Sequence, residues 1–152
     1  MSQAPVGDRP GYRVKQVQQA LRHAGDAALR GIGLSVSQYA ALRALADQPG
    51  ASSAEVARRC FVTRQSVADV LAPLRIAGAV EDGEPGRGRA RPMTLTAVGR
   101  ARLAAAETTM AEVEERMLAG LSAREVATLT ELLTLCAANL EDVSATTGPP
   151  AP

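Results

Sequence analysis

The chain has 152 residues, of which 46% are hydrophobic, 22% are charged and only 2% are aromatic. This length suits a single globular domain, and an apolar set made mostly of Ala, Leu and Val favours helices over sheets. The formal net charge is +1 at pH 7, which excludes a strongly basic or acidic chain and by itself indicates no polyanionic partner.

The distribution of charge is more informative than its sum. Residues 58–91 carry seven basic and four acidic side chains, whereas residues 100–142 carry four basic and eight acidic ones. A basic middle followed by an acidic helical end is typical of a domain with one face for nucleic acid.

The two ends of the chain, residues 1–10 and 144–152, are rich in small and turn-forming residues and are predicted to be flexible. No apolar run approaches about 18 residues, and the first residues lack the apolar stretch of a secretory signal. Cys60 and Cys136 have neither CxxC spacing nor a histidine nearby, so we expect buried, reduced thiols. We therefore expect a cytoplasmic protein with no membrane partner.

A long first helix is predicted over Tyr12–Arg30, within the segment 11–33. Apolar residues recur there every three or four positions. Gly25 is expected to weaken its middle, and Gly31 and Gly33 mark its end.

Two shorter helices follow, and each begins with a capping box, in which a serine is followed three residues later by Glu or Gln. One starts at Ser35, and its predicted buried stripe is Tyr39, Leu42, Leu45 and Ala46. The next starts at Ser52 and is expected to turn Val56 and Cys60 inward.

The fourth helix carries the candidate functional residues. Thr63 is its predicted N-cap, and its predicted core stripe is Val67, Val70, Leu71, Leu74 and Ala77. The opposite face has small residues among hydrogen-bonding ones, which lets a helix approach base edges in a groove: Arg64, Gln65, Ala68, Asp69, Ala72 and Arg75. Pro73 lies inside this pattern and lacks a backbone donor, so we expect a kink or an early end near Ala72.

A hairpin rich in Gly, Pro and Arg is predicted after Gly78, which closes the fourth helix. Residues 79–81 and 93–96 are expected to pair as two short strands. The segment between them has nothing to bury and carries three arginines at alternate positions, Arg87, Arg89 and Arg91. Alone it would be interpreted as a solvated hairpin tip, but after a helix-turn-helix it predicts a wing that contacts the minor groove or phosphates.

Two more helices are predicted, from about Thr96 to Ala119 and from Ser122 onwards. Their apolar residues keep the 3-4 spacing of a seam that needs a partner helix. The two helices could pack on each other, but the stripes exceed what one small winged-helix core needs. We therefore predict that residues 11–33 and 100–143 form a dimerisation region around a winged helix-turn-helix at residues 34–99.

Ordered segments of the chain resemble the MarR family of winged-helix transcription regulators. LSVSQYAALRAL (residues 34–45) resembles the start of the family's second helix, and residues 52–80 resemble its helix-turn-helix. LTAVG (residues 95–99) resembles the start of its long dimer helix, and LAGLSAREVATLTELL (residues 118–133) resembles the start of its last helix. Each motif is weak alone, but the ordered set covers nearly the whole chain.

The resemblance implies a mainly α fold with a two-stranded β-wing, and a homodimer whose fourth helix enters the major groove while the wing reaches the minor groove. It places Arg89 at the family's wing arginine. Arg87 stands where the family usually has an aspartate, so the usual pair that steadies the wing is absent. Many such regulators bind a small aromatic effector between the first, second and fifth helices. His23 and Tyr39 are the candidates here, although each is more simply interpreted as a structural or solvent-facing residue.

We predict a sequence-specific DNA-binding transcription regulator, a repressor released by a small-molecule effector, that binds a near-palindromic site on double-stranded DNA as a homodimer. Arg64, Gln65 and Asp69 are predicted to contact bases, although Asp69 could equally orient an arginine. The predicted phosphate contacts are Thr63, Ser66 and Arg75.

Two alternatives stay open: a winged-helix module that binds proteins without specific DNA binding, and a redox-sensing regulator that uses Cys60. An enzyme is not expected, because one histidine and two scattered cysteines cannot form a catalytic triad or an ordinary zinc site. No cofactor and no metal are predicted.

Overall fold

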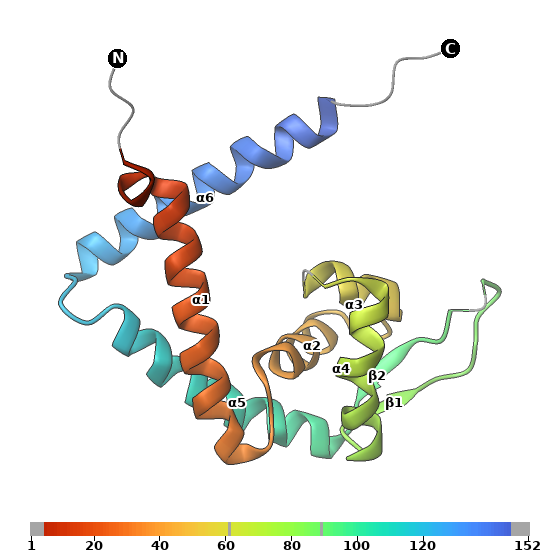
Figure 1. Ribbon diagram of the computed structural model, residues 1–152. Helices are drawn as coiled ribbons and strands as arrows, with labels where there is room; N and C mark the ends of the chain where they lie inside the picture. Colours follow the sequence, from red (N-terminus) through yellow and green to blue (C-terminus); the bar gives the residue numbers. More distant parts are fainter. Residues whose placement is uncertain (1–4, 61, 89, 147–152) are drawn as a thin grey trace, which may run out of the picture. The chain divides into compact units, whose positions relative to one another are not determined.

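The computed structural model describes residues 5–60, 62–88 and 90–146, with side chains to residue 141. The described chain is mainly helical, as predicted (Figure 1), and its elements are α1 (Pro10–Leu29), α2 (Val36–Asp47), α3 (Ser53–Arg59), α4 (Arg64–Ile76), β1 (Val80–Asp82), β2 (Met93–Leu95), α5 (Ala97–Met117) and α6 (Ala123–Thr146). Short 3-10 turns at Val6–Asp8 and Arg30–Ile32 flank α1. The chain divides into two compact units, Met1–Glu114 and Glu115–Pro152, and the first contains the helix-turn-helix and the wing.

The first helix, α1, is bounded by residues suited to its two ends. Pro10 occupies the first turn, where a missing N–H leaves no hydrogen bond unmade, and Gly33 follows the terminal 3-10 turn in the left-handed region, with φ 73°. Only part of the apolar stripe is covered. Leu29 is fully buried, whereas Val14 and Val17 are 50% and 49% exposed.

Gly25 brings α1 close to its neighbours. The sequence did not predict this role, because it indicated only that Gly25 weakens the helix. A Cβ at this position would lie 2.7 Å from Cγ2 of Val36 and 3.2 Å from Sδ of Met110. The missing side chain therefore lets α1 pack against α2 and α5.

The predicted helix caps are confirmed. Ser35 Oγ accepts a hydrogen bond from the Gln38 amide (3.1 Å), and Gln38 Oε1 accepts one from the Ser35 amide (2.9 Å). The same reciprocal box opens α3 at Ser52, and the hydroxyl of Thr63 caps α4. The sequence therefore determines these three helix starts locally.

The buried face of α2 is wider than predicted. Leu42 and Leu45 are buried as expected, but Ala46 is exposed, and Ala41 and Ala44 are buried instead. Because α2 packs against α1, α3, α4 and β2, a broad arc of its surface is covered rather than one stripe.

Of the two outcomes expected near Ala72, a kink or an early end, the early end is wrong, because α4 continues through Pro73 to Ile76. Proline removes one intrahelical hydrogen bond, but the last turn has other support. Leu74 is only 1% exposed, and the Ala77 amide donates to the carbonyl of Pro73 (3.0 Å). Gly78 follows with φ 71° and closes the helix as predicted, whereas Ala77 is exposed and not in the core.

The two strands pair antiparallel, within one residue of the predicted bounds. The register joins Val80 to Leu95, Glu81 to Thr94, and Asp82 to Met93. Strand β2 has a second partner on its other side, where the Met93 amide donates to the carbonyl of Ala51 (3.1 Å) and the Gly50 amide donates to the carbonyl of Met93 (2.8 Å). The wing is thus attached to the segment between α2 and α3.

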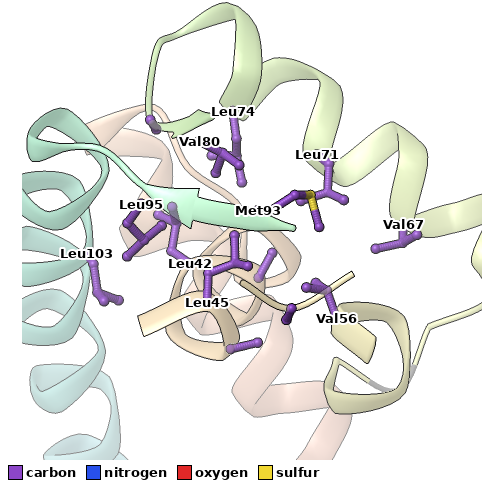
Figure 2. Close-up of a cluster of buried hydrophobic side chains, with 14 of the residues drawn as sticks. Leu42, Leu45, Val56, Val67, Leu71, Leu74, Val80, Met93, Leu95 and Leu103 are labelled. Atoms are coloured by element: carbon purple, nitrogen blue, oxygen red, sulfur yellow. The ribbon is translucent and has the colours of Figure 1, made fainter. Parts of the chain in front are cut away.

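One aliphatic core joins these elements (Figure 2). Its members come from the end of α1, from α2, α3, α4, both strands and the first half of α5, and from the segments that connect them, and all are less than 9% exposed. Those labelled in the figure are Leu42, Leu45, Val56, Val67, Leu71, Leu74, Val80, Met93, Leu95 and Leu103. This packing holds the two wing strands against the helix-turn-helix.

In the second unit, a turn at Gly120 with φ 88° precedes α6. Ser122 and Glu125 form another capping box, with the Ser122 amide donating to Glu125 Oε2 (2.7 Å). The leucines of α6 are exposed in the single chain; Leu132, Leu135 and Leu140 are 56%, 57% and 73% exposed. Across the described residues, no helix combines the length and apolar character needed to cross a membrane.

Gly99 allows α5 to begin against the chain that leaves α4. A Cβ there would collide with the backbone carbonyl of Ala79, whose carbon would lie 3.0 Å away, and that oxygen already accepts a hydrogen bond from the Thr96 amide (3.1 Å). We expect Gly99→Ala to lower the free energy of unfolding by about 1–3 kcal/mol, the range for overpacked sites, as measured by urea denaturation.

Gly11→Ala is the matched control. Gly11 is also helical, and a Cβ there meets nothing within 4 Å, so this change should be neutral or stabilise the fold by up to about 1 kcal/mol. Equal stability of the two variants would contradict the packing account.

Candidate nucleic-acid interface

The side chains predicted to read DNA lie on the exposed side of α4. The exposed residues are Arg64, Gln65, Ala68, Asp69 and Ala72. The buried residues on the other side are Val67, Leu71 and Leu74. The helix therefore turns its aliphatic side to the core and leaves a polar side free for a ligand.

The first turn of α4 presents two hydroxyl groups. Thr63 Oγ1 accepts a hydrogen bond from the Ser66 amide (3.1 Å) and donates to Ser66 Oγ (3.0 Å). Both residues are exposed. They lie at the end of the helix where backbone N–H groups and the helix dipole favour anions.

A hollow of about 650 Å³ opens between the first turn of α3, α4 and the wing. Its lining residues include Arg64, Arg75 and Arg91, together with Asp82 and Ser52. Three guanidinium groups against one carboxylate make this surface positive, which matches the phosphate backbone of DNA.

Arg75 is engaged by the wing rather than extended into solvent. Its Nε donates to Asp82 Oδ2 (2.9 Å) and its Nη2 donates to Asp82 Oδ1 (3.0 Å), and Nη2 also lies 3.1 Å from Met93 Sδ. Sequence reasoning placed Arg75 on the exposed side but missed Asp82. No periodic pattern relates a residue at the end of a helix to one on the following strand.

The wing residues are placed only in part. Arg87 and Arg91 are exposed in the loop that joins β1 to β2, and Arg89 lies outside the described residues. The base of this loop is closed by a hydrogen bond from the Gly83 amide to the carbonyl of Pro92 (2.7 Å).

Within the described residues Asp69 has no ion-pair partner, so its alternative role of orienting an arginine gains no support there.

A separate cavity of about 260 Å³ lies among α1, α2 and α5. Its apolar lining residues are Leu21, Val36, Ala40, Val62 and Met110, and its polar ones are Gln18, Arg22, Ser37 and Cys60. These are the helices predicted to surround an effector, but neither His23 nor Tyr39 lines the cavity. Both Arg22 and His23 are exposed, but neighbouring helix residues point about 100° apart, and of the two only Arg22 lines the cavity.

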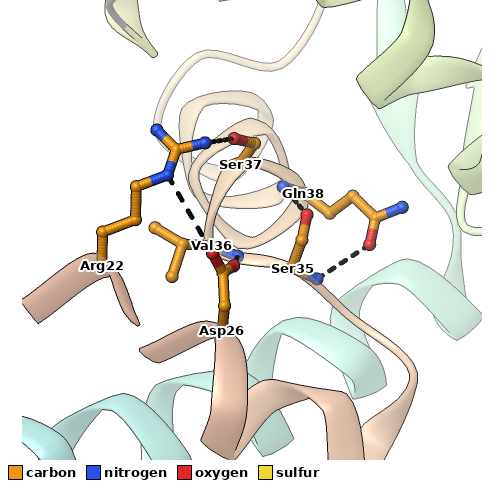
Figure 3. Close-up of polar contacts among 6 residues, drawn as sticks. All are labelled: Arg22, Asp26, Ser35, Val36, Ser37 and Gln38. Carbon is orange, nitrogen blue, oxygen red and sulfur yellow. Dashed lines mark hydrogen bonds and ion pairs between the residues drawn. The ribbon is translucent and has the colours of Figure 1, made fainter. Parts of the chain in front are cut away.

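Arg22 belongs to a polar cluster that joins α1 to the start of α2 (Figure 3). Its Nη2 donates to Ser37 Oγ (3.2 Å), and its Nε lies 4.0 Å from Asp26 Oδ2. Asp26 Oδ1 accepts a hydrogen bond from the amide of Val36, the first residue of α2 (2.7 Å). A ligand that engaged Arg22 would therefore act on the position of α2.

Tyr39 packs partly buried against the core. Burial, followed by the nearby carboxylate of Glu107, raises the pKa of Tyr39, so its phenol stays neutral. Arg43 bridges Glu107 on α5 and Asp47 on α2. The tyrosine is thus part of the contact between α2 and α5.

The expectation of two buried cysteines is wrong. Cys60 is half-buried and Cys136 is exposed, because Cys136 lies on α6, whose residues from Ala127 to Glu141 are all exposed in the single chain. Burial raises the pKa of the Cys60 thiol.

Among the described residues no group of three or more His, Cys, Asp and Glu side chains is arranged to hold a metal ion.

The arrangement defines a class of protein. A capped helix-turn-helix is followed by a two-stranded wing on the same core, and α4 and the wing share an arginine-lined hollow. These are the features of a winged-helix DNA-binding protein.

Comparison with known proteins narrows this class. The MarR family profile matches residues 32–91. The HTH-type transcriptional repressor Rv2887 of Mycobacterium tuberculosis is 42% identical over 114 residues, which cover 74% of this chain and 82% of that protein. Crystal structures of Rv2887 with salicylic acid and with DNA match at TM-scores of 0.72 and 0.71, with 38% and 37% identity, and cover 89% and 88% of this chain and 98% of each of those chains.

The chain therefore belongs to the MarR family of winged helix-turn-helix transcription regulators, as its motifs predicted. Regulators of this family are DNA-binding proteins rather than enzymes, so family membership agrees with the prediction that the chain is not an enzyme.

The raised pKa of Cys60 predicts a poorly reactive thiol, because the thiolate is the nucleophile. We expect iodoacetamide to modify Cys60 more slowly at about pH 7 than a free cysteine peptide, with the rate rising as pH increases. Peptide-resolved mass spectrometry measures this, and Cys60→Ser confirms the site. A rate above that of the free peptide would contradict this expectation and favour the redox-sensing alternative.

Proposed function

We propose that this protein is a cytoplasmic repressor that binds a near-palindromic DNA site as a homodimer and leaves it when a small aromatic effector binds. The observation that carries the proposal is the polar side of α4 beside the arginine-lined hollow. The major groove of B-DNA admits a helix of this kind, and the wing is then near the adjacent phosphates and minor groove. DNA binding by the related Rv2887 supports the same role here.

Each side chain of this surface has a distinct role in the proposal. Arg64 pairs with guanine, Gln65 with adenine, and Asp69 accepts a hydrogen bond from a cytosine amine. Thr63 and Ser66 contact phosphates through their exposed hydroxyls. The wing arginines Arg87, Arg89 and Arg91 add contacts to the minor groove or to phosphates.

The homodimer is supported by apolar side chains that the single chain leaves in water. On α1, Val14 and Val17 are 50% and 49% exposed, and on α6, Leu132 and Leu135 are 56% and 57% exposed. Burying such surfaces is favourable, and a second copy offers the same surfaces in return. A twofold dimer presents two α4 helices to half-sites roughly 34–36 Å apart, which is one turn of DNA.

We expect tight, sequence-dependent binding to the DNA just upstream of the protein's own gene, weakening steeply as salt increases. Fluorescence anisotropy against this duplex and a scrambled duplex at two salt concentrations measures it.

Arg64→Ala should cost about 1–3 kcal/mol of binding free energy and relax specificity at one base position. Uniform weakening on both duplexes would contradict a base contact by Arg64.

The effector is proposed to occupy the cavity among α1, α2 and α5. Its apolar walls suit an aromatic ring, and Arg22 with Ser37 suits a carboxylate. The related Rv2887 is described with salicylic acid, a small aromatic acid. His23 and Tyr39, the candidates from the sequence, give way in this proposal to Arg22 and Ser37, which line the cavity.

We expect salicylate to bind the protein and to weaken its DNA binding. Arg22→Gln should reduce salicylate affinity by about tenfold or more, since a charge-assisted hydrogen bond is lost; isothermal titration calorimetry measures this. His23→Gln is the matched control, because His23 is adjacent and exposed and does not line the cavity. An equal loss in both variants, or none in Arg22→Gln, would contradict the assignment.

The alternatives make different predictions in the same assays. A module that binds only proteins would bind neither duplex, even at low salt. A redox-sensing regulator would lose DNA binding on mild oxidation, and Cys60→Ser would abolish that response.

A further inference from the structure

The ion pair between Arg75 and Asp82 joins the recognition helix α4 to the wing. Both carboxylate oxygens are engaged, at 2.9 Å and 3.0 Å, by the Nε and Nη2 edge of the guanidinium. Two parallel hydrogen bonds fix the relative orientation of the groups as well as their separation. The side chains are 35% and 27% exposed, so the pair is partly shielded from solvent.

The Arg75–Asp82 pair lies at the base of the wing loop. Asp82 and Met93 are register partners at the end of the ladder from which the loop 83–92 leaves, and the same guanidinium touches Met93 Sδ at 3.1 Å. A two-stranded ladder of three register pairs is marginal on its own. One side chain of α4 therefore touches both wing strands at the root of the loop.

The aspartate that the resemblance implies for the wing is not present in this sequence. The resemblance implies an aspartate where Arg87 stands. Asp82, five residues earlier, supplies a carboxylate at the root of the loop, with its arginine partner on the recognition helix.

We propose that Arg75 and Asp82 are positioning residues for DNA binding, whose pair locks the wing to α4. Arg64 on α4 and Arg91 on the wing line the same hollow, so the lock sets their separation before DNA arrives and reduces the ordering cost of binding. Arg75 then acts as a tether and not as the phosphate contact predicted from sequence. The inference rests on the proposed function, because it concerns the same DNA-binding surface.

The direction in which removal of Asp82 changes the affinity for DNA separates this positioning role from a simple effect of charge. Asp82 is the one carboxylate among the described residues that line the hollow. Its removal makes the hollow more positive, which by charge alone should tighten binding to DNA. A tether predicts the opposite, because the wing is released.

The first test is Asp82→Asn, with Glu84→Gln as the matched control. Both changes remove one negative charge from the wing region, and Glu84 is exposed and does not line the hollow. In anisotropy titrations we expect Asp82→Asn to weaken DNA binding roughly tenfold, within the usual range for coupled neighbours, while Glu84→Gln binds as tightly as wild type or more tightly. Unchanged or tighter binding by Asp82→Asn overturns the proposal.

The second test exchanges the charges in the double variant Arg75→Glu, Asp82→Arg. If Arg75 is only a tether, the reversed pair restores most of the affinity that either single variant loses. If Arg75 contacts a phosphate directly, the double variant stays weak, and the proposal is overturned.

A third readout does not depend on DNA. Trypsin cleavage after Arg87 reports how freely the wing moves, and we expect it to be several-fold faster in Asp82→Asn than in wild type or Glu84→Gln. If wild type binds no duplex, the proposed function fails, and proteolysis alone judges the tether. Equal cleavage rates in all three proteins overturn it.

Discussion

The burial of Met93 ties the wing to the helices that precede it. The residue is 0% exposed in the core, and its backbone is hydrogen-bonded to Gly50 and Ala51 between α2 and α3 at 2.8 Å and 3.1 Å. Its sulfur lies 3.1 Å from the guanidinium of Arg75 at the end of α4. A ladder this short is marginal by its own hydrogen bonds. The aliphatic core fixes the two strands, and the proposed Arg75–Asp82 tether acts where the ten-residue loop leaves them.

A short segment between α3 and α4 lines the cavity and leads directly into α4. Cys60 and Val62 line the cavity, and Thr63, the next residue, caps α4. On the other side, the carboxylate of Asp26 fixes the first turn of α2 through the amide of Val36 at 2.7 Å. A ligand in the cavity is thus in contact with two elements that set the position of α4, which gives the proposed effector response a direct physical route.

The sequence predicted what is local. Capping boxes at Ser35 and Ser52, the αL glycine after α4 and the polar side of α4 all depend on residues a few positions apart. The Arg75–Asp82 pair, the role of Gly25 and the lining of the cavity depend on contacts between distant segments, which periodicity does not encode. Pro73 was misread for a related reason, since burial of Leu74 supports the turn that proline weakens. His23 and Tyr39 were selected by residue type, whereas the direction of each side chain decides what lines the cavity.

Selection from a pool of random duplexes asks directly whether α4 reads a DNA sequence, as proposed. Purified protein is mixed with the pool, bound duplexes are recovered and amplified over several rounds, and the enriched sequences are determined. If α4 reads sequence in a twofold dimer, the selection enriches an inverted repeat whose half-sites lie one turn of DNA apart. Recovered duplexes with no shared motif would contradict it.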